Sequence, residues 1–146
     1  LNGEIAVNSG DDVFADCSGN EAIAKAYNLG ILGGYNSADT RSGVYVGPDD
    51  LITREQAATM LARLMAKLDE NLGRSMLDRM TGVTLPFVDT IADWALNSVE
   101  TVYEAGVMNG TSGTTFSPKN NYTIEQSIVT VMRISEWSMM GGDFDY

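Results

Sequence analysis

The feature that most constrains this chain of 146 residues is a pattern that occurs twice in the same order. It consists of a Phe-x-Asp triplet, a Gly-x-x-x-Gly segment, a short segment ending in Pro, and a Thr-x-Glu-Gln segment. These blocks occupy residues 14–16, 30–34, 46–48 and 53–56 in the first copy, and 87–89, 106–110, 116–118 and 123–126 in the second. Four blocks in one order are hard to obtain by chance, so we interpret the chain as two divergent copies of one structural unit.

The repeat also sets the expected domain organisation. We expect residues 1–146 to form a single domain, with one repeat at 14–68, a connection at 69–86 and a second repeat at 87–136. The chain is long enough for a core of its own. One repeat alone could not bury its apolar faces, so the two copies should pack against each other. Residues 1–13 are too few to hold a third copy.

The first helix of each copy is predicted from apolar residues at helical spacing. In the first copy, residues 21–29 carry Ala22, Ile23, Ala26, Tyr27 and Leu29. In the second copy, residues 93–105 carry Trp94, Ala95, Val99, Val102 and Tyr103. Gly30 and Gly106 follow the last apolar residues, as glycines that end helices do.

The second helix of each copy is predicted from its capping box. Thr53 and Gln56, and again Thr123 and Gln126, have the spacing at which a hydroxyl accepts from one backbone N–H while the amide reaches back to another. The apolar residues expected to face the core are Ala57, Met60, Leu61, Leu64, Met65 and Leu68 in the first copy. In the second copy they are Ile124, Ile128 and Val131, with Met132 beside them and Ser135 completing the stripe. A short extra helix is expected within residues 70–80.

These elements predict an all-α fold in which two helix-loop-helix repeats pack as a helical bundle.

The charge and the composition of the chain reduce the number of functions that it could have. The net charge is −11, with a pI near 4.1, which argues against binding to nucleic acid and to anionic lipid. No stretch approaches the length of a membrane span, so no membrane insertion is expected.

The composition also excludes several kinds of chemistry. The chain has no histidine, which removes the Ser-His-Asp triad, most zinc sites and the usual pH switch. Its one cysteine, Cys17, can form no internal disulfide, and we interpret it as an inert thiol. No phosphate-binding loop or calcium loop is present. We therefore expect no catalytic residues, no metal ligands, no cofactor and no enzyme activity.

The ordered blocks resemble a known family. A Phe-x-Asp start, a helix ending in Gly-Ile-x-x-Gly, an aromatic-x-Pro loop and Ile-Thr-Arg before a helix are similar to the S-layer homology (SLH) motif, over roughly residues 14–68 and 87–136. The resemblance implies a secreted protein of the bacterial cell surface whose modules bind a secondary cell-wall polysaccharide, often one with pyruvylated sugars. Such modules usually come in threes around a central bundle. A third repeat outside this chain, or a homodimer, would complete the set.

The resemblance also suggests glycan-binding residues. The family's Thr-Arg-Ala-Glu element matches Thr53-Arg54-Glu55-Gln56, which keeps the Arg, and Thr123-Ile124-Glu125-Gln126, which does not. The candidate glycan-binding residues are Arg54, Asp16, Gly30, Gly34, Asp89, Trp94 and Gly110. Each has a structural alternative. Arg54 could be a surface or ion-paired residue, and the two Asp could be caps or turn formers for the following helices. Trp94 could belong to the core, and the glycines could serve backbone conformation.

The chemistry of a pyruvate ketal fits Arg54. Its carboxylate would meet a planar guanidinium at the first position of a helix, where free N–H groups and the helix dipole also attract anions. Ile124 cannot supply that charge, so the second copy should bind weakly or not at all. The alternative function is a protein-protein or self-assembly module, in which the repeat survives as a scaffold with degenerate glycan sites.

Overall fold

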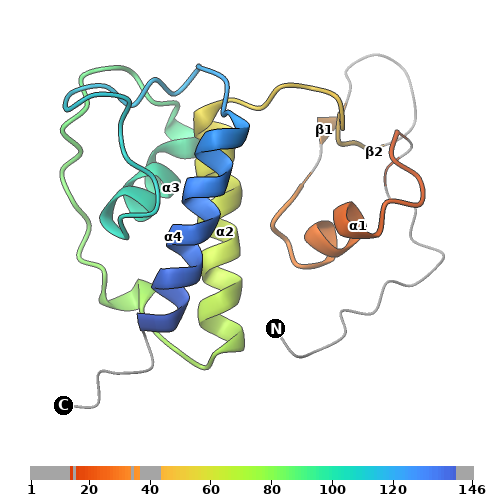
Figure 1. The fold of residues 1–146 in the computed structure, drawn as a ribbon, viewed down its shortest axis with the longest axis horizontal. Helices are drawn as coiled ribbons and strands as arrows, with labels where there is room; N and C mark the ends of the chain where they lie inside the picture. Colours follow the sequence, from red (N-terminus) through yellow and green to blue (C-terminus); the bar gives the residue numbers. More distant parts are fainter. Residues whose placement is uncertain (1–13, 15, 34, 37–43, 141–146) are drawn as a thin grey trace. The chain divides into compact units, whose positions relative to one another are not determined.

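The computed structural model describes residues 14, 16–33, 35–36 and 44–140, which form two compact units that divide between Asp50 and Leu51 (Figure 1). We call them unit 1 and unit 2. The division falls inside the first repeat, between its two helices. The all-α prediction is confirmed, since four α-helices account for nearly half of the described residues and the two strands are only two residues long each. The single-domain organisation stays a prediction.

Unit 1 contains one helix and one pair of short strands. Helix α1 spans Glu21–Asn28 and begins at Asn20, whose side-chain oxygen accepts from the N–H of Ile23 at 3.2 Å. The helix ends at Gly30, where a φ of +72° favours glycine. Strands β1 (Tyr35–Asn36) and β2 (Val44–Tyr45) pair antiparallel, with Tyr35 opposite Tyr45.

Unit 2 is built around three α-helices. They are α2 (Arg54–Asn71), α3 (Asp93–Glu104) and α4 (Ile124–Met140), with a short 3₁₀ helix, η1 (Leu77–Arg79), between the first two. Both predicted capping boxes are confirmed: Thr53 and Gln56 bond reciprocally, as do Thr123 and Gln126. The first helix of the second copy, α3, packs on the second helix of the first copy, α2, so neighbouring copies share a core.

The core of unit 2 draws on both copies. Its buried members are Ala58, Leu61, Met65, Val99, Val102, Val107, Met108, Phe116, Ile134 and Trp137. The predicted stripe of α2 is largely confirmed, because Leu61 and Met65 are buried there and Leu64 and Leu68 pack against them. Burial of these side chains is the main favourable contribution to folding.

The predicted stripe of α4 is wrong. Ile124, Ile128, Val131 and Met132 are exposed, and the helix buries Thr130, Ile134 and Trp137 instead. The tertiary contacts of Trp137 and Ile134 with the shared core decide which face turns inward, and the sequence offered apolar residues on both faces. The short helix predicted within residues 70–80 is present only as a single 3₁₀ turn. Helix α2 runs on to Asn71, Gly73 follows with a φ of +63°, and only η1 forms afterwards.

The two copies share a set of contacts around their first helix. We call these segments the first module (the described residues between 14 and 50) and the second module (residues 87–118). In each, a Phe ring stacks edge-on against a helical Tyr, with centroids 5.2 Å apart. In each, the Asp of the Phe-x-Asp triplet accepts two backbone N–H groups from the segment ending in Pro. The repeat in sequence is therefore a repeat in structure.

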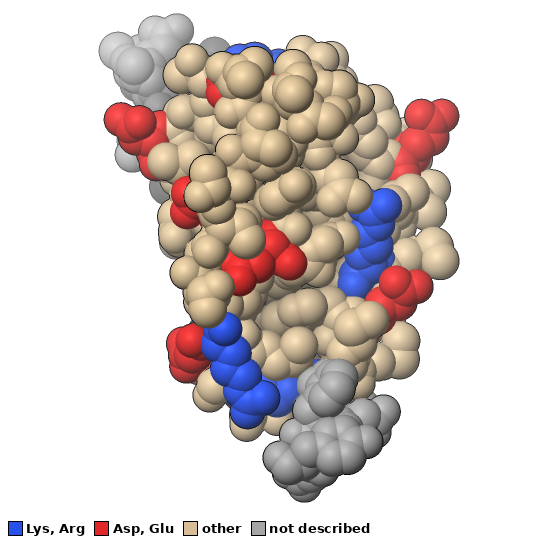
Figure 2. All heavy atoms as spheres, turned by 90° about the vertical axis from the view of Figure 1, so that its left-hand side faces the viewer, with Lys and Arg blue, Asp and Glu red and all other residues tan. Residues whose placement is uncertain are grey.

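The charges on unit 2 are interspersed. On the face that Figure 2 shows, acidic and basic side chains are scattered over an otherwise uncharged surface, and some of opposite charge lie next to one another. Within the described residues, no helix is both long and apolar enough to cross a membrane.

Candidate functional site

A pocket of about 380 Å³ lies beside the N-terminal half of α4 in unit 2. Its walls come from α4 and from the loop that follows α3, and Arg54 of α2 contributes to it. The lining residues are Arg54, Met108, Asn109, Gly110, Thr111, Glu125, Gln126, Val129, Thr130 and Arg133. Two arginines therefore meet in one pocket of a strongly acidic chain, and they share it with amide and hydroxyl groups and with one acidic residue, Glu125. This set of donors suits an anionic, hydroxyl-rich ligand.

Arg54 is held in place by the second module. Only 4% of this residue is exposed. Its Nε donates to the carbonyl of Phe116 at 2.8 Å, its Nη2 donates to the carbonyl of Asn109 at 2.6 Å, and its guanidinium lies 4.9 Å from the centre of the Phe116 ring. Among the described residues, its Nη1 has no hydrogen-bond partner. These two bonds use two of the five N–H groups of the guanidinium. Arg54 is therefore a structural residue that also lines the pocket.

The expected anion site at the N-terminus of α2 is wrong, because its N–H groups are occupied. The N–H of Arg54 donates to Asn120 O at 2.9 Å and that of Glu55 donates to Pro118 O at 3.1 Å. Thr53 accepts the next two N–H groups, that of Gln56 through its side-chain oxygen and that of Ala57 through its carbonyl. The carbonyls that fill the site come from the second copy, 62 or more residues away in the chain, which the sequence could not reveal.

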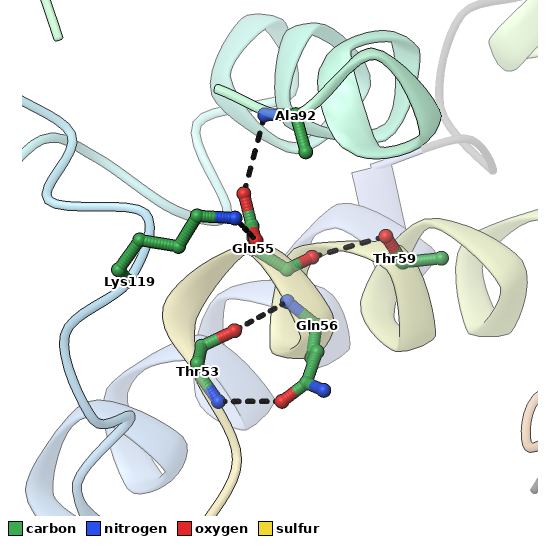
Figure 3. Close-up of polar contacts among 6 residues, drawn as sticks. All are labelled: Thr53, Glu55, Gln56, Thr59, Ala92 and Lys119. Atoms are coloured by element: carbon green, nitrogen blue, oxygen red, sulfur yellow. Dashed lines mark hydrogen bonds and ion pairs between the residues drawn. The ribbon is translucent and has the colours of Figure 1, made fainter. Parts of the chain in front are cut away.

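Glu55, next to Arg54, ties the same helix start to two further segments (Figure 3). Its carboxylate is buried, forms an ion pair with the exposed Lys119, and accepts from the N–H of Ala92 at 3.3 Å. Ala92 is the residue before α3, which has no side-chain cap of its own. Glu55 therefore fixes where α3 begins and where the segment before α4 lies. No pattern in the sequence indicates this role.

Asp89 positions the opposite side of Phe116. Its carboxylate accepts from the N–H of Phe116 at 2.9 Å and from that of Ser117 at 2.6 Å, so the Phe116 peptide is held by Asp89 on one side and Arg54 on the other. Burial would raise the pKa of Asp89, but these backbone donors and the Arg54 charge outweigh it and hold the pKa below its usual range. Asp89 therefore caps a loop that lies far along the chain.

This geometry predicts a pH-dependent contribution from Asp89. Because its pKa is lower in the folded state, its stabilisation is present above the unfolded pKa of about 4 and is lost as the pH falls through the folded value. Asp89→Asn should lower the free energy of unfolding at neutral pH by about 2 kcal/mol, and by less below pH 4. Urea unfolding at several pH values measures this. Asp78→Asn, an exposed carboxylate on η1, is the control, and equal losses in the two variants would contradict the assignment.

Asp16 occupies the equivalent place in unit 1. It accepts from the N–H of Val46 at 3.1 Å and of Gly47 at 2.7 Å. Burial opposes the charged form, yet these bonds hold its pKa below the usual range. Neither Asp caps the following helix, since Asn20 caps α1 and Ala92 precedes α3, so the alternative of a helix cap is wrong. Asp16 does lie in a turn before α1. Both aspartates hold their own loops.

The remaining candidates divide between the pocket and other places. Gly110 lines the pocket with Arg54, whereas Gly30 lies at the end of α1, where its positive φ serves the helix terminus. Gly34 lies outside the described residues. Trp94 is 58% exposed near the start of α3, so its assignment to the core is wrong, and it does not line the pocket.

Arg133 is the pocket residue that sequence reasoning missed. In the sequence, Arg133 recurs 70 residues after Arg63, and from sequence alone both arginines are interpreted as surface residues or members of inter-helix ion pairs. In the structure its Nη1 donates to the carbonyl of Val107 at 3.4 Å, and its side chain lines the pocket together with Arg54. Its recurrence was a signal, but only the position of α4 shows where it points. Among the described residues, no group of three metal-ligating side chains forms.

The sequence matches the S-layer homology domain family over residues 14–58 and again over residues 86–123. The chain belongs to this family. Both matches begin at or next to the Phe that opens each copy, and the first includes Arg54 and its capping box. The pocket lies where the α2 start of one SLH repeat meets the loop of the next, so it needs two repeats to form.

Several curated proteins are similar to this SLH chain. It is 30% identical over 121 residues to an amylopullulanase of Thermoanaerobacterium thermosulfurigenes, covering 80% of this chain and 6% of that protein. It is 28% identical over 141 residues to exoglucanase XynX of Acetivibrio thermocellus, covering 94% of this chain and 11% of that protein. It is 24% identical over 124 residues to cell surface glycoprotein 1 of Acetivibrio thermocellus, covering 83% of this chain and 5% of that protein. The chain thus spans a small part of each relative, and no solved structure matches it.

Proposed function

We propose that this chain is a non-catalytic anchoring module that holds a secreted bacterial protein at the cell surface by binding a secondary cell-wall polysaccharide. Membership of the SLH family supports the anchoring role. The relatives support it as well, because one region recurs in two glycan-degrading enzymes and a cell surface glycoprotein, as a small fraction of each. A region shared by such different proteins fits attachment better than catalysis.

The observation that carries the ligand proposal is the pocket with two arginines. Arg54 and Arg133 both line it, alongside the amide of Asn109 and the hydroxyl of Thr111. In a chain of net charge −11, a local pair of guanidinium groups is the feature able to attract an anion against the general field. We propose that the ligand is a sugar bearing a carboxylate, as in a pyruvate ketal, and that its hydroxyls bond to the neutral groups.

The pocket gives the second copy a larger part in binding than we expected from the sequence. Ile124 supplies no charge, as expected from the sequence, but the second copy supplies Arg133, Asn109, Gly110 and Thr111 to the pocket that Arg54 lines. We therefore propose one composite binding site made by both copies, in place of a strong site in the first copy and a weak one in the second.

The test is co-sedimentation of the purified chain with Gram-positive cell-wall sacculi. We expect binding that is lost when the pyruvate ketals are removed by mild acid. Arg133→Gln should weaken binding about tenfold or more, because a charge-assisted contact to the carboxylate is removed. Arg79→Gln, which removes an exposed arginine on η1, should bind like the original chain. Equal binding by the two variants, or no effect of ketal removal, would contradict the proposed ligand.

A second candidate function, self-assembly, is favoured by one observation. The outer face of α4 is apolar and exposed, which is unusual for a surface helix of a monomer.

A further inference from the structure

The exposed face of α4 carries a line of apolar side chains that we call the α4 stripe: Ile124, Ile128, Val131, Met132 and Met139. Ile124 is 79% exposed and Ile128 is 56% exposed. Residues at these spacings lie along one side of a helix. They are distinct from Thr130, Ile134 and Trp137, which α4 turns into the core. The stripe is a contiguous apolar surface of the kind that marks an interaction site.

The repeat shows what covers this face in the other copy. Each stripe residue has a counterpart 70 residues earlier on α2, as Thr123 has in Thr53. Those counterparts are Arg54, Ala58, Leu61, Ala62 and Asp69; all but Ala62 are buried, and Ala62 packs against the core. The cover is the second module, whose helix α3 packs on α2. The equivalent faces of two equivalent helices therefore differ: the face of α2 is an interface, and that of α4 is exposed.

The second module covers α2 with four apolar side chains. Val99, Val102, Val107 and Met108 are each at most 1% exposed and join Ala58, Leu61 and Met65 in one cluster. Their positions follow from the turn after α3, where the N–H groups of Val107 and Met108 both donate to the carbonyl of Val102. This turn places residues from the helix and from the following loop on one surface.

The first module has the same turn and the same surface. The N–H groups of Ile31 and Leu32 both donate to the carbonyl of Ala26 at 3.0 and 3.3 Å. With Gly30 aligned to Gly106, the counterparts of the four covering side chains are Ile23, Ala26, Ile31 and Leu32. All four are apolar, and all four are only partly buried. Helix α1 contains no buried residue, whereas α3 contains three. The first module thus presents a docking surface of the kind that the second module has already buried.

We propose that the α4 stripe binds the first module of a second copy of this chain. Ile23, Ala26, Ile31 and Leu32 of that copy take the places that Val99, Val102, Val107 and Met108 hold on α2. When the first module of each chain binds the α4 stripe of the other, the two contacts are identical and the assembly closes as a twofold dimer. The proposal rests on the paired surfaces within the repeat and is independent of the ligand.

Two sets of polar contacts of the template do not carry over. Arg54, which donates to the carbonyls of Phe116 and Asn109, has the apolar Ile124 as its counterpart. On α2, the buried Glu55 pairs with Lys119 of the segment that follows the second module. Residue Glu125 on α4, which is exposed, lies 70 residues after Glu55, and Asp49 at the end of the first module lies 70 residues before Lys119. Two carboxylates would face each other in the dimer. The dimer is therefore weaker than the internal contact, and a basic residue at position 49 should strengthen it.

The first test is sedimentation of the full chain over a wide range of concentrations. We expect a monomer–dimer equilibrium. Ile128→Asp should weaken dimerisation at least about tenfold, because it would place a carboxylate in an apolar contact. Val88→Asp, at a similarly exposed valine outside α4, should leave it unchanged. A chain that stays monomeric throughout, or a Val88→Asp variant that is weakened equally, would overturn the proposal.

A mixing experiment distinguishes this dimer from one in which two α4 stripes meet. Ile23→Asp removes the docking surface of the first module and Ile128→Asp removes its receptor, so each variant alone should be monomeric at concentrations where the original chain dimerises. An equimolar mixture retains one intact contact and should form a heterodimer. Circular dichroism of each variant establishes that it is folded. If Ile23→Asp still dimerises alone, or the mixture stays monomeric, the first module is not the occupant.

A gain of affinity gives an independent measure. Asp49→Lys should strengthen the dimer up to about fivefold by providing Glu125 with a partner. Asp78→Lys makes the same change of charge on η1 and should have a smaller effect, arising only from the lower net charge. Equal strengthening by both variants would show that position 49 is not at the contact, and would overturn the proposed register.

Discussion

Replacing Gly110 by Ala should lower the free energy of unfolding by about 3 kcal/mol, one of the two largest effects expected for a single substitution here. A Cβ at this position would lie 2.5 Å from Cε1 of Phe87, 2.5 Å from the carbonyl oxygen of Thr115 and 2.6 Å from that of Ser112. Two of these atoms belong to the backbone and cannot move aside as a flexible side chain could. The loop that forms one wall of the pocket would have to open.

Gly113→Ala is the matched control, because it lies in the same loop and a Cβ there meets nothing within 4 Å. Its free energy of unfolding should change by less than about 1 kcal/mol. Urea unfolding followed by tryptophan fluorescence measures both, since the indole of Trp137 lies in the core. If the two variants unfold at the same urea concentration, the loop does not have the close packing that we describe.

Arg54→Ala should lower the free energy of unfolding by about 3 to 4 kcal/mol. The substitution leaves the carbonyls of Phe116 and Asn109 without their donors, and it removes the cation that faces Asp89 and the Phe116 ring. A surface arginine that merely binds a ligand would have almost no effect on stability. This prediction therefore separates a buried anchoring role from a purely ligand-binding role.

Two companion variants sharpen the result for Arg54. Arg54→Lys keeps the charge but provides one ammonium in place of the planar fork that reaches both carbonyls, so its loss should be intermediate. Arg79→Ala removes an exposed arginine and should change stability by about 0.5 kcal/mol or less. If Arg54→Ala behaves like Arg79→Ala in urea, the bonds to the second module contribute little, and its side chain is free for a ligand.

These expectations also bear on the interpretation of binding data. Arg54 is bonded to the loop that forms the pocket wall, so its removal disturbs the loop as well as any contact with the ligand. Loss of glycan binding in Arg54→Ala would therefore not identify a contact. Arg133, whose protein bond is longer, is the better position for that question.

Helix ends and fold class could be predicted from the sequence, because they depend on groups close together in the chain. The capping boxes join residues three positions apart, and the glycines that end α1 and α3 act within one turn. The recurrence of the four blocks was likewise visible without coordinates and identified the family. The net charge of −11 argued against binding to nucleic acid, and the absence of histidine excluded the Ser-His-Asp triad and most zinc sites.

Only the tertiary structure decided the partners of Arg54, the roles of Asp16 and Asp89, and the inward face of α4. The charge of Arg54 made it a candidate from the sequence, but its two hydrogen bonds join it to residues 55 and 62 positions away in the chain. Asp89 bonds 27 and 28 positions away rather than capping its own helix. Helix α4 has apolar residues on two sides, and the fit of Trp137 and Ile134 into a core built by both copies selects one of them. Periodicity reports that a helix has an apolar face, but the free energy that chooses between two such faces comes from neighbours that only folding brings together.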